Sequence, residues 1–343
     1  ASTTYVVCEV EAAGGEIGIG YTAGDAVCAR LIEGTLAEVV YGGDAIAPQR
    51  IQAALFAATR NSGRPGIVAL SVSAIDLAVW DLKAKLVGLP LVELLGSMKE
   101  SIPVYGSGGL TSYSTEQLTS ELGGWVGQGI PRVKMKVGRD PVADRERVAA
   151  AREAIGPEAE LYVDANGAYS RKQALAQAER CAEQGVSWLE EPVPSDDLDG
   201  LRAIRERVPA PIEVTAGEYG FSPTYFARMI DARAVDVLQA DVTRCGGITD
   251  FLRIDALCRG RGLPLSTHCA PAASLHVACA TRELRHIEWF VDHIRCERIL
   301  FDGLIEPRDG QLHPDRSRPG HGIELKKSDL DQHLVFAGRK EDG

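Results

Sequence analysis

From about residue 101 onward, short apolar strands alternate with amphipathic helices at a regular spacing of roughly 20–30 residues. After SIPVYGSGG, the strand-like segments are PRVKMKVG, ELYVDANG, VSWLEEP, APIEVTAGE, VDVLQADVT, LPLSTHC and RHIEWF. Helical segments such as DRERVAAAREAIG lie between them. Strands that run in one direction need a crossover, and a helix is the usual one. The repeat therefore predicts a parallel α/β barrel.

The segments that flank this repeat have other patterns. Up to about residue 45 the sequence alternates like strands around turns, and from Pro48 to Leu95 it has helical periodicity. Beyond about residue 296 the chain is rich in loops, Gly and Pro. A length of 343 residues is enough for two domains, or for one barrel with an addition.

Composition excludes several classes of protein. The net charge of −11 argues against a nucleic-acid partner, which would need an excess of Lys and Arg. The eight cysteines contain no C-x-x-C pair, so we expect reduced thiols and a cytoplasmic location. The N-terminal ASTTYVVCEVEA has no leader pattern, and no apolar run approaches the ~20 residues of a membrane helix. We therefore expect neither secretion nor a membrane partner.

Each strand of the repeat ends in a polar side chain. Because parallel strands of a barrel share one direction, these side chains should meet at one mouth. Alternation agrees with this placement, since residues of opposite phase face the surrounding helices. In IPRVKMKVG, for example, two lysines share one face and the apolar residues share the other. The strand-end residues are Lys134, Lys136, Asp164, Glu190, Glu218, Asp241, His268 and Glu288, and Asn166 shares the face of Asp164.

Three of these residues, Asp164, Glu190 and Glu218, end successive strands and together offer an all-oxygen set of ligands. Hard divalent cations prefer such ligands, and we expect one Mg²⁺. Any one of the three could equally be a salt-bridged carboxylate, so the expectation depends on the whole set. A cation there would hold a substrate carboxylate and stabilise the added negative charge of an enediolate.

The remaining side chains offer acid–base groups. Lys136 lies nearer the end of its strand, where we expect a base whose pKa is lowered by burial and by the charge of Lys134. His268 could be oriented by Asp241, which would give a second acid–base group on the opposite face.

The segments VKMKVG, VDANG, WLEEP and AGE, the pair Asp241–His268, and Glu288 resemble the enolase superfamily, and within it the mandelate racemase subgroup. The resemblance covers nearly the whole chain. It implies an α/β fold, a modified (β/α)7β TIM barrel with an α+β capping domain. The N-terminal part of the cap would be residues 1–100, the barrel 101–295, and a segment that returns to the cap 296–343. The first strand and mobile loop that precede TTYVVCEVE in relatives are not in this sequence, so either they lie outside it or access to the site differs.

The resemblance also implies residue roles. Asp164, Glu190 (rather than Glu191) and Glu218 would bind Mg²⁺. Lys136 would be one base, Lys134 would face the substrate carboxylate, the Asp241–His268 dyad would act from the other face, and Glu288 would hydrogen-bond the enolate, with Asn166 also at the substrate. QADVTRCGG lacks the lysine found there in muconate-lactonizing and dipeptide-epimerizing relatives, which excludes those subgroups.

These features predict a magnesium-dependent dehydratase of a sugar acid, a lyase that forms a 2-keto-3-deoxy acid. The alternative is a racemase or epimerase of a 2-hydroxy acid that uses the same residues. Dehydration is preferred because most of the resembling subgroup are acid-sugar dehydratases, which is an analogy. A non-catalytic binding protein is a minor alternative, because no ligand or base is missing. We also expect a small-molecule carboxylate substrate and a homo-oligomer.

Overall fold

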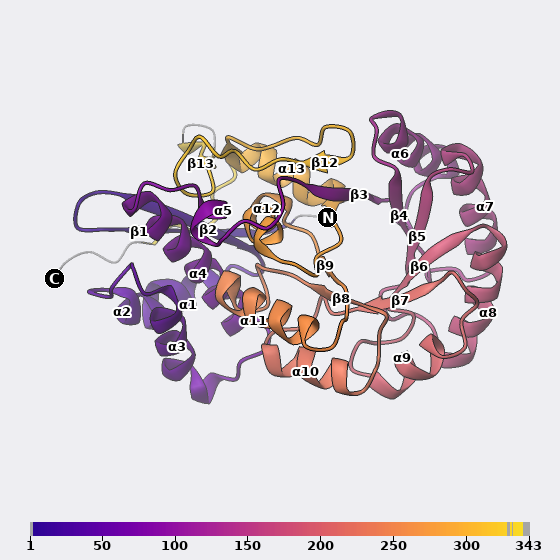
Figure 1. Ribbon diagram of the computed structural model, residues 1–343, viewed down its shortest axis with the longest axis horizontal. Coiled ribbons are helices and arrows are strands. Elements are labelled where there is room, and N and C mark those ends of the chain that lie inside the picture. Colours follow the sequence, from indigo (N-terminus) through magenta and orange to yellow (C-terminus); the bar gives the residue numbers. More distant parts are fainter. Residues whose placement is uncertain (1–2, 328–329, 331, 339–343) are drawn as a thin grey trace.

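The computed structural model describes residues 3–327, 330 and 332–338. Its larger part is the predicted barrel, in which parallel strands follow the order β10-β3-β4-β5-β6-β7-β8-β9 (Figure 1). A parallel bridge between Leu265 and Leu284 links the two ends of this sheet. The strands are β3 (Ile102–Gly108), β4 (Arg132–Lys136), β5 (Glu160–Asp164), β6 (Val186–Glu190), β7 (Glu213–Ala216), β8 (Val237–Ala240), β9 (Leu265–Thr267) and β10 (Ile287–Phe290).

One helix follows each strand from β3 to β9, so the expected modified TIM barrel is confirmed. Ser114 and Ser170 begin two of these helices with a capping box, in which a serine and the glutamine three residues later satisfy free backbone N–H groups. The helices are α6 (Thr115–Gly127), α7 (Asp144–Ile155), α8 (Arg171–Glu183), α9 (Leu198–Arg205), α10 (Pro223–Asp231), α11 (Gly247–Arg259) and α12 (Pro271–Ala280), and α13 (Val291–Leu300) follows β10.

The two faces of the strands are filled differently. Val133 and Met135 of β4 are buried in the apolar layer beneath the helices. Inside the barrel, Tyr105, Tyr162 and Trp188 form a buried aromatic cluster with ring centroids 5.1–6.3 Å apart. This cluster fills the interior below the polar strand ends, because a TIM barrel is a packed core and no channel.

The capping part precedes the barrel and lies beside it at the indigo end of Figure 1. In its hairpin, Gly18 and Gly20 of β2 lie so close to α4 that an added Cβ would be 2.1 Å from a backbone oxygen of that helix. Only glycine permits this approach. The elements are β1 (Tyr5–Glu11), β2 (Ile17–Ala23), α1 (Val27–Leu31), the π-helix η1 (Ile32–Leu36), α2 (Ala37–Val40), α3 (Pro48–Ala58), the 3₁₀ helix η2 (Arg60–Ser62), α4 (Ile67–Leu86) and α5 (Leu91–Leu94).

The sequence analysis is wrong about the end of the first strand-like section. Strands end at Ala23, and residues 27–40 are helical instead of continuing the alternation to about residue 45. Buried Cys28 and Leu36 lie eight residues apart, which is a helical spacing, and both pack at the capping end. The predicted helical section from Pro48 to Leu95 contains α3, α4 and α5.

Buried polar contacts join the cap to the barrel. On α4, Asp76 accepts hydrogen bonds from the backbone N–H and the hydroxyl of Thr249 in α11, at 3.0 and 2.6 Å. Asp81, also on α4, accepts from the backbone N–H groups of Ile19 and His321, both at 2.9 Å. The chain after α13 thus contacts the cap again. Its strands are β11 (Phe301–Asp302), β12 (Gln311–Leu312) and β13 (Glu324–Leu325).

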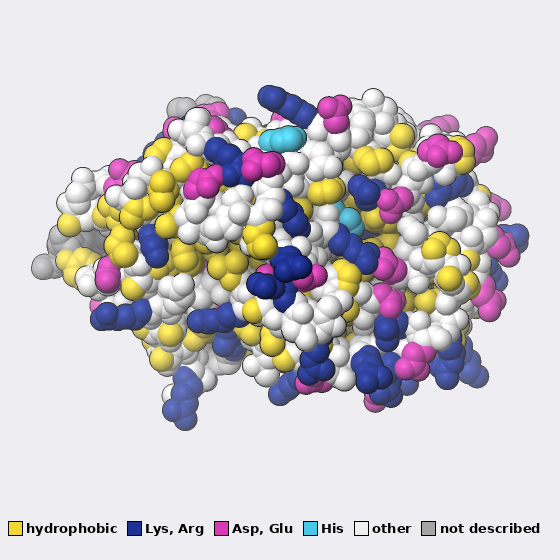
Figure 2. All heavy atoms as spheres, viewed as in Figure 1, with side chains coloured by type: hydrophobic (Ala, Val, Ile, Leu, Met, Phe, Trp, Pro, Cys, Tyr) yellow, Lys and Arg dark blue, Asp and Glu magenta, His cyan; other side chains and the backbone are white. Residues whose placement is uncertain are grey.

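The surface carries charges of both signs. In Figure 2, Lys, Arg, Asp and Glu are interspersed over the barrel end, whereas apolar side chains gather over the capping end. Among the residues that the structure describes, no helix combines the length and apolar character that crossing a bilayer requires.

Candidate active site

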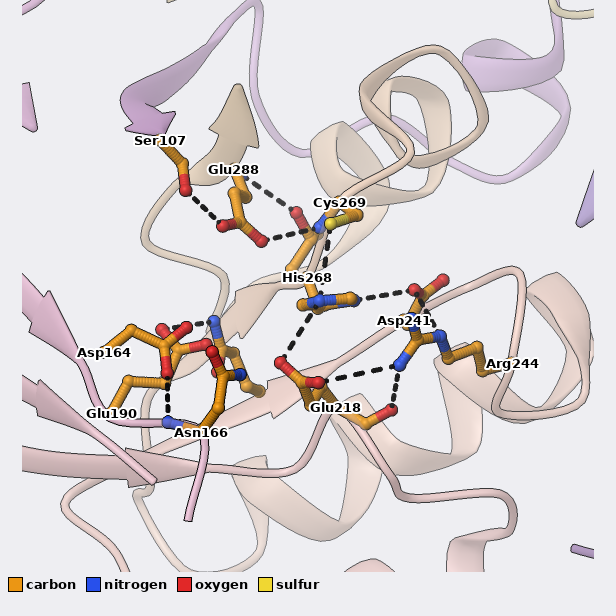
Figure 3. A network of polar contacts seen from close by, with 12 residues as sticks. Ser107, Asp164, Asn166, Glu190, Glu218, Asp241, Arg244, His268, Cys269 and Glu288 are labelled. Atoms are coloured by element: carbon orange, nitrogen blue, oxygen red, sulfur yellow. Dashed lines mark hydrogen bonds and ion pairs between the residues drawn. The ribbon is translucent and has the colours of Figure 1, made fainter. Parts of the chain in front are cut away.

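The polar strand ends predicted from the sequence converge at the carboxyl ends of the barrel strands (Figure 3). Lys136, Asp164 and Glu190 are register partners on β4, β5 and β6, so their side chains lie next to one another. Three turns after strands place non-glycine residues in the left-handed region, at Asn166, Glu191 and Cys269, with φ of 43°, 40° and 46°. Such conformations cost energy and concentrate at functional sites.

The two lysines of β4 lie at different depths. Lys134 is fully buried, and its Nζ is 2.6 Å from Glu190 Oε2, 2.8 Å from Glu288 Oε1 and 3.6 Å from Asp164 Oδ2. Lys136 lies nearer the mouth and pairs with the same Oδ2 of Asp164. Lys134 is therefore a fixed positive charge beneath the site, as its depth in the strand predicts.

The expected low pKa of Lys136 is wrong for this arrangement. Burial lowers the pKa, but the carboxylate of Asp164 outweighs burial, so the pKa is raised above its ordinary value. Lys134 does oppose this rise, as expected, but its effect is smaller. The sequence reasoning counted the neighbouring lysine and omitted the carboxylate directly opposite on β5.

Asp164, Glu190 and Glu218 form the predicted trio of carboxylates. One oxygen from each lies within 4.8 Å of the others, and all three side chains are buried. Oε1 of Glu190 accepts no hydrogen bond in the described part of the chain, and Oε2 of Glu218 faces only the His268 imidazole there, at 3.2 Å. Buried oxygens without donors are costly unless something else binds them. An all-oxygen set with free, inward lone pairs fits a hard cation such as Mg²⁺.

The ionisation of this trio indicates crowded negative charge. Burial, and then repulsion from Asp164, raise the pKa of Glu190 to about 8. Burial, and then Glu218, raise the pKa of the adjoining Glu191 to about 9. Burial also acts to raise the pKa of Glu218, but the charge of His268 outweighs it and holds this pKa below its ordinary value. A divalent cation would relieve this repulsion.

His268 and Asp241 form the expected dyad on β9 and β8. Nδ1 of His268 is 2.8 Å from Asp241 Oδ2, and Thr243 fixes the other carboxylate oxygen through its N–H and hydroxyl, at 2.7 and 2.6 Å. Nε2 then faces the site, 3.2 Å from Oε2 of Glu218. Burial lowers the pKa of His268, but Cys269 and Glu218 outweigh it, and the pKa is raised well above its ordinary value.

Glu288 is held at the end of β10 from three sides. Its Oε1 accepts from Ser107 Oγ at 2.6 Å and pairs with Lys134, while its Oε2 accepts from the backbone N–H of Cys269 at 2.9 Å. Burial acts to raise the pKa of Glu288, but Lys134 outweighs it and holds the pKa well below its ordinary range. The carboxylate is therefore ionised. Asn166 lies exposed in the loop after β5, and its N–H donates to Asp164 Oδ1 at 2.9 Å.

Sequence reasoning missed several residues that shape this site. Ser107 shares a strand face with Tyr105 in SIPVYGSGG, so the same alternation could have identified it. Gln239 donates to Glu190 Oε2 at 3.2 Å, and Arg244 lies 3.3 Å from Asp241 Oδ2. Cys269, whose Sγ is 3.3 Å from Nε2 of His268, depends on a left-handed turn that no sequence pattern signals.

The fold and the site define a class of protein: a capped, modified TIM barrel with a trio of carboxylates between a lysine pair and a histidine–aspartate dyad. Two family models match the chain. Residues 1–96 match the mandelate racemase / muconate lactonizing enzyme N-terminal domain, and residues 117–329 match the enolase C-terminal domain-like family. The chain therefore belongs to the enolase superfamily, in its mandelate racemase subgroup.

Three individual proteins illustrate how similar this chain is to other members of the family. The chain is 32% identical to L-talarate/galactarate dehydratase of Salmonella typhimurium, over 90% of this chain and 77% of the relative. A mandelate racemase/muconate lactonizing enzyme-like protein from Rubrobacter xylanophilus is 53% identical, with a TM-score of 0.94 over 96% of this chain and 91% of that one. L-talarate dehydratase from Polaromonas sp. JS666, complexed with Mg and L-glucarate, is 32% identical, with a TM-score of 0.86 over 95% and 92% of the two chains.

Proposed function

We propose that this protein is a magnesium-dependent dehydratase of a sugar acid. The observation that carries the proposal is the buried trio Asp164, Glu190 and Glu218, with a lysine on one side and the His268 imidazole on the other (Figure 3). Acid–base groups on two sides of a cation site suit removal of one proton and delivery of another. Similarity to dehydratases of talarate and galactarate supports the reaction class and a hydroxylated carboxylate as substrate.

The trio would hold one Mg²⁺, a proposal supported by the unpartnered Oε1 of Glu190 and by the Mg complex of the relative from Polaromonas. When bound, Mg²⁺ supplies an electrophile for the substrate carboxylate, and it makes the proton on the adjacent carbon more acidic. It would also offset the Asp164 charge that now raises the pKa of Lys136. A neutral Lys136 at the mouth can then act as a base.

The proton steps are assigned to residues on the two sides. Lys136 Nζ takes the proton from the carbon next to the substrate carboxylate, while the Lys134 ammonium faces the enediolate oxygens. Glu288, which is ionised in this arrangement, holds Lys134 in place, and it would donate a hydrogen bond to the enolate only after taking up a proton. His268 gives its Nε2 proton to the departing β-hydroxyl, which leaves as water. The enol that remains tautomerises to a 2-keto-3-deoxy acid. The keto acid and one water together contain all the atoms of the substrate. Asp241 keeps Nδ1 of the histidine occupied, so that Nε2 is the nitrogen that exchanges protons.

Other expectations also stand as proposals. We place the N-terminal part of the cap at residues 1–100, the barrel at 101–295 and the returning segment at 296–343. Contacts of His321 with the cap support the last of these. All eight cysteines are free thiols, which supports a reducing, cytoplasmic location. A homo-oligomer is proposed from the family resemblance alone.

A product assay tests the proposed reaction. The protein is incubated with Mg²⁺ and a panel of aldonic and aldaric acids, and 2-keto acid is detected with semicarbazide, with a chelator-treated sample as control. Signal that needs Mg²⁺ supports dehydration. The alternative, a racemase or epimerase that uses both bases, gives optical rotation change without semicarbazide product. That outcome with the best substrate would replace the dehydratase by the racemase.

A further inference from the structure

We propose that His268, Cys269 and Glu288 form a second cation site, selective for thiophilic metals such as Zn²⁺, whose occupation blocks the acid–base histidine. The three side chains are all buried, and one donor atom from each lies within 4.8 Å of the others. In Figure 3 the thiol and the imidazole nitrogen point toward one another, and the carboxylate lies above them. This set of residues is distinct from the Asp164–Glu190–Glu218 trio.

Each donor has a lone pair available for a metal. Nδ1 of His268 is engaged with Asp241, so Nε2 is the nitrogen that would coordinate a metal, once its proton leaves and its 3.2 Å contact with Glu218 Oε2 is given up. Oε1 of Glu288 is occupied by Lys134 and Ser107, but among the described residues Oε2 accepts only the N–H of Cys269, which leaves one lone pair. The sulfur lies 3.3 Å from Nε2, a separation that two ligands of one Zn²⁺ can have.

Backbone geometry holds the sulfur in this position. Cys269 and Ala270 are both in the left-handed region, with φ of 46° and 43°, although neither is glycine. The turn is fixed by hydrogen bonds from Cys269 N to Glu288 and from Ala270 N to His293 Nδ1, at 2.9 and 3.3 Å. Little rearrangement is therefore needed to bring a thiolate, an imidazole and a carboxylate onto one ion.

The chemistry of the donors separates this site from the carboxylate trio. Mg²⁺ prefers oxygen ligands and is a poor partner for sulfur, whereas Zn²⁺ binds thiolate and imidazole. A set of one Cys, one His and one Glu leaves a fourth position open, as in zinc sites that bind a further small ligand. Binding releases the Cys269 thiol proton and the Nε2 proton of His268 to solvent, so affinity should rise with pH.

Occupation of the site would remove the general acid of the proposed dehydration. A metal on Nε2 of His268 excludes a proton from that atom, and the enzyme stops while Mg²⁺ stays on the trio. This consequence rests on the proposed function, but the metal site itself does not. The two are separated below by a spectroscopic signal that is independent of turnover.

The test uses Co²⁺ as a spectroscopic substitute for Zn²⁺, with Mg²⁺ in saturating excess to fill the trio. Thiolate coordination gives Co²⁺ a near-ultraviolet charge-transfer band, so the band's titration yields the affinity, and Zn²⁺ then displaces Co²⁺. Cys269→Ser and Cys269→Ala remove the sulfur, while Cys296→Ser removes the half-buried thiol of α13 as a matched control. Circular dichroism checks that each variant is folded.

We expect the band in the wild type and in Cys296→Ser, and its loss in both Cys269 variants, with Zn²⁺ affinity at least about 100-fold weaker. Zn²⁺ inhibition that excess Mg²⁺ does not relieve would agree with the second site. A band that persists in folded Cys269→Ser, or its absence from the wild type, would overturn the proposal. Inhibition relieved by Mg²⁺ with no band would assign Zn²⁺ to the trio instead. A band without any dehydratase activity would keep the metal site and reject only the proposed function.

Discussion

The buried amide of Gln239 offers a precise test of how the site prepares a metal ligand. Its Nε2 donates to Glu190 Oε2 at 3.2 Å and to the hydroxyl of Tyr105 at 3.1 Å. Oε2 also accepts from Lys134 at 2.6 Å and from Trp188 at 3.3 Å. With one oxygen held by three donors, the other oxygen of Glu190 is aimed into the site without a partner. The proposed perturbation is Gln239→Met, which keeps the volume and removes the amide.

The expected loss of Mg²⁺ affinity in Gln239→Met follows from the number and kind of hydrogen-bond donors to Glu190 Oε2. A hydrogen bond to a charged group contributes about 1.5–3 kcal/mol, and loss of a group that orients a metal ligand costs about 10–100-fold in metal affinity. Two donors to Oε2 remain in Gln239→Met, so we expect the lower end, about 10-fold or ~1.4 kcal/mol. Because Oε1 of Gln239 itself has no partner in the described chain, removal of the amide also relieves one unpaired buried group.

Tyr105→Phe is the matched control. It removes the other partner of the same amide, so it disturbs the same buried network, but it leaves the bond between Gln239 and Glu190 in place. Each variant removes two buried hydrogen bonds, since Gln239 also bonds Glu190 and the Tyr105 hydroxyl also donates to the Thr267 carbonyl, so both should lose a similar ~2 kcal/mol of folding stability. Only Gln239→Met should lose Mg²⁺ affinity, because only that change touches a proposed ligand.

Calorimetric titration of Mg²⁺ into the metal-free proteins, together with thermal unfolding, measures both quantities. Equal Mg²⁺ affinity in wild type and a folded Gln239→Met would refute the idea that the amide orients Glu190. An equal loss of affinity in Tyr105→Phe would show that general loosening of the core, and no specific bond, controls the ligand.

Three further predictions follow from the site. Lys136→Ala should abolish exchange of the substrate α-proton with deuterated solvent, whereas Met135→Leu, which faces the helices, should stay within about twofold of wild type; exchange that survives in Lys136→Ala would move the base elsewhere. Glu190→Gln should abolish Mg²⁺ binding in calorimetry, and a greater sensitivity of Glu191→Gln would reassign the ligand. Because the pKa values of Glu190 and Glu191 are raised to about 8 and 9, the folded metal-free protein keeps protons that the unfolded chain loses at lower pH. Its Tm should therefore fall as the pH rises from about 5 and level off near pH 9, and fall less with Mg²⁺; a Tm that rises over this range would contradict the shifts.

The fold and most site positions were predictable because strands impose a period of two. Once the βα repeat is recognised, the phase of each strand decides which side chains enter the barrel, and parallel direction brings their ends to one mouth. Lys134 and Glu288 could be placed in this way, although 154 residues separate them in the chain and their contact is only 2.8 Å. The sequence does not identify the helical residues 27–40, because a short apolar run is compatible with both the strand period of two and the helical period of 3.6.

Other features depend on turns and on three-dimensional neighbours, which period alone does not reveal. The left-handed backbone at Cys269 is imposed by surrounding hydrogen bonds, so its thiol beside His268 has no sequence signal. The pKa of Lys136 was predicted with the wrong sign because its closest partner, Asp164, comes from the adjacent strand. A pKa depends on the distances to all nearby charges, whereas the sequence gives the spacing only between residues of the same strand.

Charge balance explains why one site combines acid–base groups with a cation. Among the described residues, the buried acidic groups at the mouth outnumber the permanently charged Lys134, Lys136 and Arg244 that pair with them. The chain alone can restore balance only by holding protons, which is the physical meaning of the raised pKa values of Glu190 and His268. A divalent cation balances the same charge and leaves the carboxylates ionised. The lysine and the histidine are then no longer needed to balance the negative charge, so they can lose and gain protons. The cation that would bind the substrate would therefore also allow these two residues to act as base and acid.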